Sequence, residues 1–261
     1  MKPARSAFEA PAWRAEGAAP ALTFDGVTKV FPDGTHAVAD ASFEVRPGEF
    51  VTIIGPSGCG KSTLLRMAAG LTDVTDGKLE VAPGNIGYVF QDATLLPWRT
   101  VQENVELFGE LRDVPKAARM KAAKEAIDLV GLHGFERFYP RALSGGMKMR
   151  ASLARSLTMK PNVFLFDEPF GAIDEITRDR LNTELMELFG ARRFAGLFIT
   201  HSITEAVYLS TRVLVMSARP GRITHTFDIP FSYPRTEDLR FQAEFAELTG
   251  RVSHALREAH A

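Results

Sequence analysis

Short apolar runs alternate with polar segments along most of the chain. Residues 50–54, 163–166 and 197–200 form compact, mainly apolar runs, a pattern typical of strands that are buried on both faces of a parallel sheet. Residues 22–24 and 42–45 alternate between apolar and polar positions, which predicts half-buried strands. The pattern therefore predicts a sheet-based core.

Helical spacing appears between these runs. Residues 62–69 are predicted to form a helix with Gly70 at its end, and residues 101–158 are predicted to be mainly helical. Leu181, Leu185 and Leu188 share one face of a later helix, and Ser202 and Glu205 have the spacing of a capping box. The last strands are expected at residues 213–216 and 222–229, and a polar helical tail is expected after them.

Strand–loop–helix units in series predict an α/β fold with a mainly parallel core sheet. An antiparallel β subdomain would precede it, and a helical lobe at about residues 96–160 would be inserted into it. We expect residues 1–20 to be a disordered tail, residues 21–231 to be the main domain and residues 232–261 to be the helical tail.

Composition narrows the class of protein. The 31 Lys and Arg nearly cancel the 32 Asp and Glu, so bulk charge does not favour a nucleic-acid partner. A single cysteine rules out a disulfide within the chain and favours a reducing compartment. No apolar run approaches the length of a membrane span, and the N-terminal stretch lacks the apolar block of a secretory signal.

The residues that follow the 50–54 run predict a phosphate-binding loop. They read GPSGCGKST, a full match to G-x-x-x-x-G-K-[ST] between a strand and a helix. Its glycines let successive N–H groups face a phosphate, while the Lys61 ammonium reaches the β- and γ-phosphates and the Ser62 hydroxyl can ligate Mg²⁺. The predicted ATP-binding residues are Gly55, Pro56, Ser57, Gly58, Cys59, Gly60, Lys61, Ser62 and Thr63.

Two carboxylates close the run at residues 163–166. Ligands gather at the carboxyl ends of parallel strands, so Asp167 is placed to hold Mg²⁺ directly or through water. Glu168 is placed to act as a general base on the attacking water.

A third motif, LSGGM at residues 143–147, makes the set more specific. In this order and spacing, GPSGCGKST, LSGGM and FLFDEP closely resemble the ABC ATPase family. The resemblance covers roughly residues 22–229 and implies an ABC ATPase fold with ATP hydrolysis. A P-loop kinase or a module that only binds ATP is disfavoured by LSGGM and Glu168.

The resemblance implies further roles where residues match the family pattern. Gln91 would sense Mg²⁺ and the attacking water, and His201 would contact the γ-phosphate. Asp174 would contact a second copy of the chain, and Phe31 would stack on adenine unless it is a core residue.

The family pattern also implies a head-to-tail homodimer. Ser144 and the amides of Gly145 and Gly146 would close on ATP held by the partner chain, and a helix start suits this anion contact. Met147 replaces the glutamine most often found there, so a side-chain contact at this position is not expected.

Residues 94–104 (TLLPWRTVQEN) and 216–223 (MSARPGRI) resemble the importer branch for nitrate, sulfonate and taurine. The implied partners are a multi-span membrane permease and, indirectly, a solute-binding protein, with this chain on the cytoplasmic face of the cell membrane. An ABC ATPase with a role in translation or DNA repair is the main alternative, although those types have two cassettes or long coiled coils. An exporter is disfavoured because no membrane span is fused here.

Two side chains leave alternatives open. Cys59 lies before Lys61 at a helix start, where a thiolate is favoured, so we expect a reactive thiol rather than a buried filler. Trp98, in the PWRT segment, is either an anchor for the permease or folded back on its own lobe.

Overall fold

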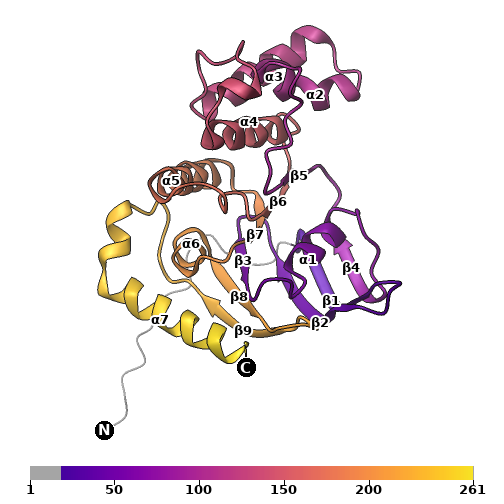
Figure 1. The fold of residues 1–261 in the computed structure, drawn as a ribbon, viewed down its shortest axis with the longest axis vertical. Coiled ribbons are helices and arrows are strands. Elements are labelled where there is room, and N and C mark those ends of the chain that lie inside the picture. The colour runs from indigo at the N-terminus through magenta and orange to yellow at the C-terminus, as the bar shows by residue number, and fades with distance from the viewer. Residues whose placement is uncertain (1–18, 261) are drawn as a thin grey trace.

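A six-stranded sheet forms the centre of the computed structural model, which describes residues 19–260 (Figure 1). Its order is β5-β6-β7-β3-β8-β9, in which the first five strands are parallel and β9 pairs antiparallel with β8. The strands are β3 (Phe50–Ile54), β5 (Ile86–Val89), β6 (Val163–Asp167), β7 (Ala195–Ile199), β8 (Arg212–Met216) and β9 (Ile223–Asp228). The mainly parallel core sheet is therefore confirmed.

A smaller antiparallel sheet packs beside it, with the order β2-β1-β4. It consists of β1 (Leu22–Val30), β2 (His36–Val45) and β4 (Asp76–Val81). Leu22, Phe24 and Val45 are buried and join the core beneath α1 (Lys61–Ala68). This confirms the N-terminal antiparallel subdomain, although its strands are longer than the sequence pattern indicated.

The helix after β3 ends where the sequence predicted. Gly70 has a φ of 69°, and the amides of Gly70 and Leu71 donate to the carbonyls of Met67 and Arg66. This pair of hydrogen bonds caps the helix and requires the left-handed backbone that glycine adopts without strain. Leu71 lies past the cap and is 61% exposed.

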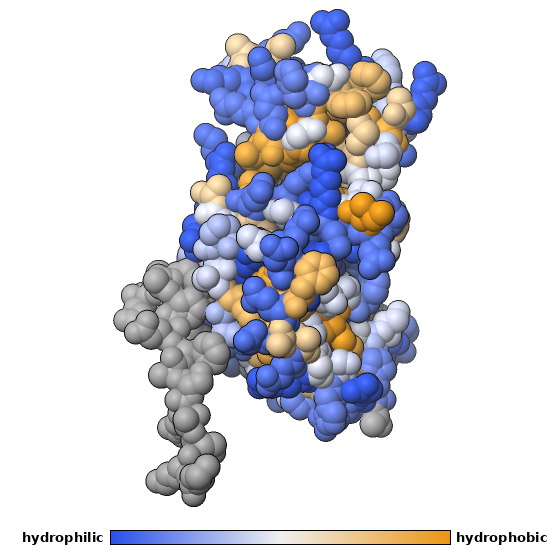
Figure 2. Space-filling model, turned by 90° about the vertical axis from the view of Figure 1, so that its left-hand side faces the viewer, coloured by the Kyte–Doolittle hydropathy of each residue, from blue (hydrophilic) through white to orange (hydrophobic). Residues whose placement is uncertain are grey.

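Three helices form a lobe at one end of the molecule: α2 (Val101–Leu111), α3 (Lys116–Leu129) and α4 (Gly145–Leu157), with the short 3-10 turn η1 (Pro140–Ala142) before α4 (Figure 1). The lobe has its own apolar centre, in which Val105, Ile127 and Ala151 are fully buried. Its chain leaves the sheet after β5 and returns at β6. On the face in Figure 2, apolar residues gather in the lobe and where it meets the rest of the molecule.

Helices α5 (Glu175–Arg192) and α6 (Ile203–Leu209) cover the sheet together with η2 (Glu237–Phe241) and α7 (Ala243–Glu258). The segment expected as a polar tail is helical, but α7 buries Phe245, Leu248 and Val252 in the same core as α5 and β6. It therefore packs as part of the domain, because its apolar positions fall on one helical face. In residues 19–260 no helix is both long and apolar enough to span a bilayer.

Candidate functional site

The predicted phosphate loop connects β3 to α1, at the carboxyl end of the parallel strands. Lys61 is 6% exposed, and its Nζ donates to the carbonyls of Gly55 and Pro56, both at 2.8 Å. Gly60 has a φ of 107°, and a Cβ there would lie 2.5 Å from the Ala37 carbonyl oxygen. The loop is thus held tightly against β2, and only glycine fits at this position.

Two of the three predicted Mg²⁺ ligands, from distant parts of the chain, meet at this loop. The Ser62 hydroxyl donates to Oδ1 of Asp167 at 2.7 Å, and Tyr88 donates to Oδ2 at 3.2 Å. Burial, and then the Asp167 charge, raise the pKa of Tyr88, so the phenol stays protonated and able to donate. The oxygens are of the kind that Mg²⁺ prefers, and their meeting fits the prediction. Tyr88 was not among the predicted site residues, because nothing in its local sequence marks it as a partner of Asp167.

Glu168 and His201 also come together. Nδ1 of His201 lies 3.1 Å from Oε2 of Glu168, within hydrogen-bonding distance, and the two side chains are 57% and 25% exposed. Glu168 has a φ of 46°, a left-handed conformation that is unusual for a residue with a side chain. The chain therefore leaves the extended path at Glu168, directly after β6, and the carboxylate faces His201, two residues after the end of β7.

The residues predicted to meet a second chain lie on the starts of two neighbouring helices. Ser144 caps α4 by accepting from the Met147 amide at 3.3 Å, and Asp174 caps α5 by accepting from the Thr177 amide at 3.0 Å. The Thr177 N–H lowers the pKa of Asp174. Over residues 19–260, no hydrogen bond or ion pair joins Ser144 or Asp174 to the phosphate loop. Gly145 is exposed beside Ser144.

Gly146 has a packing role that the motif did not reveal. A Cβ there would lie 2.8 Å from the Thr177 methyl group, so α4 and the first turn of α5 touch through this glycine. Arg150 of α4 reinforces the contact with an ion pair to Glu184 of α5, at 2.7 Å. The lobe is therefore fixed to α5 at two points.

Gln91 is exposed in the loop that follows β5. The next residues are tied to α4, because the buried Arg155 guanidinium donates to the carbonyls of Ala93 and Thr94 at 3.1 and 2.9 Å. Arg155 was missed because it reads as an ordinary helix position. Phe31 is half-buried against the small sheet, with Nζ of Lys29 5.4 Å from its ring centre, so the adenine contact stays a prediction.

The expectation of a reactive thiol at Cys59 was wrong. The side chain is 1% exposed, and burial raises the pKa of the thiol more strongly than the Lys61 charge lowers it. Trp98 is 71% exposed, which removes the alternative of a ring folded back on its own lobe.

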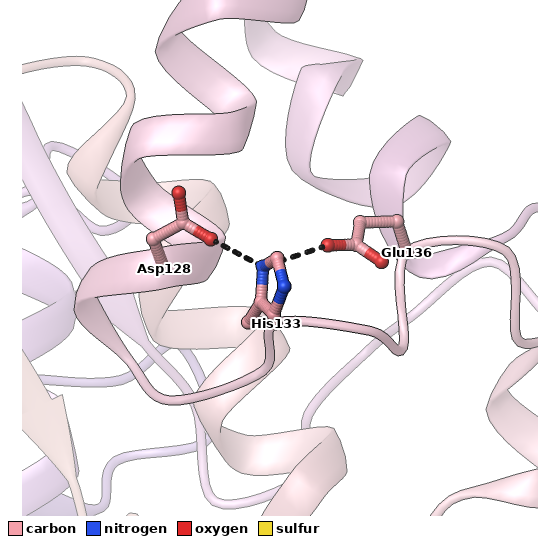
Figure 3. Close-up of side chains that lie close together, drawn as sticks. All are labelled: Asp128, His133 and Glu136. Atoms are coloured by element: carbon pink, nitrogen blue, oxygen red, sulfur yellow. Dashed lines mark hydrogen bonds and ion pairs between the residues drawn. The ribbon is translucent and has the colours of Figure 1, made fainter.

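A different cluster of ionisable side chains lies in the lobe, on the last turn of α3 and in the loop that follows it (Figure 3). Nδ1 of His133 is 3.1 Å from Asp128 and 3.7 Å from Glu136. Among the described residues, this is the single group of three His, Cys, Asp or Glu whose ligand atoms all lie within 4.8 Å. Because His133 is 80% exposed and nothing else converges on it, the cluster reads as a surface ion-pair group.

Known proteins resemble this chain in sequence. The sequence model of the ABC transporter family matches residues 38–171. An uncharacterized ABC transporter ATP-binding protein of Methanocaldococcus jannaschii is 44% identical, over 91% of each chain. The aliphatic sulfonates import ATP-binding protein SsuB of Bacillus cereus (strain ATCC 10987 / NRS 248) is 42% identical, over 83% of this chain and 89% of its own.

Solved structures of ATP-binding cassettes have a similar fold. A dimeric ATP-binding cassette in a post-hydrolysis state, bound to ADP and Pi, superposes with a TM-score of 0.69 and 28% identity, covering 80% of this chain and 98% of that one. The cbiO1 subunit of the Clostridium perfringens cbiONQ transporter shares the fold, with a TM-score of 0.75 at 23% identity over 91% and 99% of the two chains. The chain thus belongs to the ABC transporter family and is an ATP-binding subunit that hydrolyses ATP.

Proposed function

We propose that this chain powers the uptake of a small solute of the sulfonate, taurine or nitrate type. The observation that carries the substrate class is its 42% identity to an aliphatic sulfonates import subunit. Residues 94–104 and 216–223, which resemble that importer branch, support the same class. The solute would be recognised by the permease and a solute-binding protein, so it need not touch this chain.

ATP would bind with its phosphates in the loop at residues 55–63 and with adenine on Phe31. Mg²⁺, held by Ser62, Asp167 and Gln91, would neutralise charge on the β- and γ-phosphates. The 2.7 Å contact between Ser62 and Asp167 supports this ligand pair. Lys61, now held by two carbonyls, would exchange them for phosphate oxygens.

Glu168 would accept a proton from the water that attacks the γ-phosphate. His201 lies against the Glu168 carboxylate and would contact the γ-phosphate itself, which fixes both groups around the reacting atoms. The arrangement requires no covalent intermediate on the protein. Hydrolysis would then open the dimer that bound ATP holds closed, and this opening would drive transport.

A head-to-tail dimer completes the proposal. Ser144 and the Gly145 and Gly146 amides would cover ATP bound to the partner chain, and Asp174 would contact that chain. The exposed Ser144 lies at a helix start, where N–H groups favour an anion. The dimer would bind a permease from the cytoplasmic side of the cell membrane, with the exposed Trp98 at the contact.

Reconstitution tests this function against a role outside transport. The chain would be co-expressed with a candidate permease and solute-binding protein, and purified through a tag on the permease. We expect co-purification and ATP turnover stimulated by a loaded solute-binding protein, with alkanesulfonates, taurine and nitrate compared as solutes. An ATPase that co-purifies with ribosomes or DNA-repair proteins, and not with a permease, would contradict the proposal.

A further inference from the structure

The loop between β8 and β9, residues 217–222, contacts the phosphate loop. The Arg219 guanidinium donates to the Gly58 carbonyl through Nη2 at 2.7 Å and through Nε at 3.1 Å. Gly58 has a φ of 73°, and a Cβ there would lie 3.3 Å from the same Nη2. A planar guanidinium that engages one carbonyl through two nitrogens fixes the direction of that carbonyl.

The backbone around Arg219 is itself anchored on two sides. The Gly221 amide donates to the Ala37 carbonyl, and the Ala39 amide donates to the Gly221 carbonyl, both at 3.0 Å. The Ala218 amide donates to the Ala259 carbonyl at 3.1 Å, at the end of α7. Arg219 therefore projects from a loop held by β2 and by the C-terminal helix.

The direction of the Gly58 carbonyl determines what the next amide can do. In a trans peptide the carbonyl of Gly58 and the N–H of Cys59 point in opposite directions. The Gly58 carbonyl points out to Arg219, and the Cys59 amide contacts the Pro56 carbonyl at 3.4 Å. The Lys61 ammonium binds the same Pro56 carbonyl at 2.8 Å. The Cys59 N–H and the Lys61 ammonium, both predicted phosphate donors, thus converge on one point inside the loop.

We propose that Arg219 is a positioning residue for ATP binding: by holding the Gly58 carbonyl outward, it keeps the Cys59 amide directed at the phosphate site. The inference rests on the proposed assignment of residues 55–63 to the phosphates. Arg219 itself does not touch the phosphates. Its loss would leave the 58–59 peptide free to rotate, and the loop would have to be ordered each time ATP binds.

The test compares Arg219→Ala, Arg219→Lys and Arg222→Ala. Arg222 is the matched control, because it lies in the same loop but reaches Asp40, at 3.7 Å, instead of the phosphate loop. We expect Arg219→Ala to raise the KM for ATP and the calorimetric Kd for Mg-ADP by about three- to tenfold, with kcat changed less than about twofold. Arg219→Lys should restore part of the affinity, because one donor remains.

Several outcomes would overturn the inference: unchanged affinity in Arg219→Ala, an equal loss in Arg222→Ala, or a lower melting temperature with normal affinity. Lys61→Ala, measured in parallel, separates the two proposals. If Lys61→Ala binds nucleotide normally, the assignment of the phosphate loop fails. If Lys61→Ala loses binding while Arg219→Ala keeps it, only the role of Arg219 fails.

Discussion

Nδ1 of His201 lies 3.1 Å from Oε2 of Glu168, although 33 residues separate the two along the chain. The strands that end beside them, β6 and β7, are parallel neighbours paired from Val163–Ala195 to Asp167–Ile199. This register places the two side chains together at the carboxyl edge of the sheet. A change to either side chain should therefore alter the surroundings of the other.

We expect Glu168→Gln to slow ATP hydrolysis by about 10²–10⁴-fold while ATP binding is retained, because only proton acceptance from water is lost. That loss corresponds to about 2.7–5.4 kcal/mol of barrier. Phosphate release and ATP binding would be measured on the same sample, and the variant should accumulate as an ATP-bound dimer. Glu187→Gln, at an exposed position of α5, is the control. Near-normal turnover in Glu168→Gln would remove Glu168 as the base.

Mixing two inactive variants tests the shared site. Lys61→Ala and Ser144→Arg each damage both sites of a homodimer, but a mixed dimer has one doubly damaged site and one intact site. We expect ATP turnover in the mixture to exceed that of either variant alone. Turnover that stays at the level of the single variants would favour motifs that act within one chain.

Trp98→Ala should weaken capture by the membrane subunit and leave nucleotide binding by the isolated chain unchanged. The ring is 71% exposed, and a large aromatic at that exposure gains most from a partner that covers it. Leu111→Ala is a matched control, because Leu111 has the same exposed fraction at the end of α2. Equal capture of both variants would argue against an anchor at Trp98.

Cys59 should resist maleimide in the folded protein, with or without Mg-ATP, and should react once the chain is unfolded. The thiol is 1% exposed, and burial raises its pKa, so little thiolate is present or accessible at neutral pH. Intact mass before and after denaturation gives the extent of labelling. Rapid labelling of the native chain that ATP slows would contradict this expectation.

Glu205→Gln should raise the stability of the isolated chain at neutral pH. Glu205 is 5% exposed, and burial raises its pKa above the usual 4.5. A raised carboxyl pKa contributes stability that is fully present below the unfolded value and is lost as pH rises through the folded value. The melting temperature of the variant should therefore exceed that of the native chain at neutral pH.

The difference in melting temperature between Glu205→Gln and the native chain should shrink as pH falls towards 4.5, the pKa of a glutamate in the unfolded chain. Glu187→Gln, at an exposed position, should show no such trend. A Glu205→Gln variant that melts below the native chain at every pH would show that its carboxylate is stabilised by neighbours more than burial penalises it.

The sequence predicted the elements whose signal is local. The buried strands at Phe50–Ile54 and Val163–Asp167 stand out because both of their faces are apolar, and Gly70 ended α1 through backbone geometry alone. β4 was missed because it lies at the edge of the small sheet and its DGKLEV sequence is mostly exposed. β5 is four residues long, too short for a clear period.

Contacts between distant segments were harder to predict. The order of the motifs predicted that Ser62 and Asp167 share a site, and the two side chains do contact each other. The contacts of Tyr88 with the same carboxylate and of Arg219 with the Gly58 carbonyl depend on the order of strands in the sheet, so they could not be predicted. The prediction of a reactive thiol at Cys59 was wrong for a related reason. Its neighbours in sequence favour a thiolate, while residues from elsewhere in the fold cover it and decide its pKa.

The close fit of Gly146 against Thr177 has a mechanical consequence. Ser144 and Asp174 lie on the two helix starts that this contact joins, and Arg150 and Glu184 pin the same helices further along. Because there is no room even for a methyl group, a swing of the lobe cannot separate these helix starts without first opening the contact. We therefore expect the two surfaces that would meet a second chain to move together for as long as this contact and the ion pair hold.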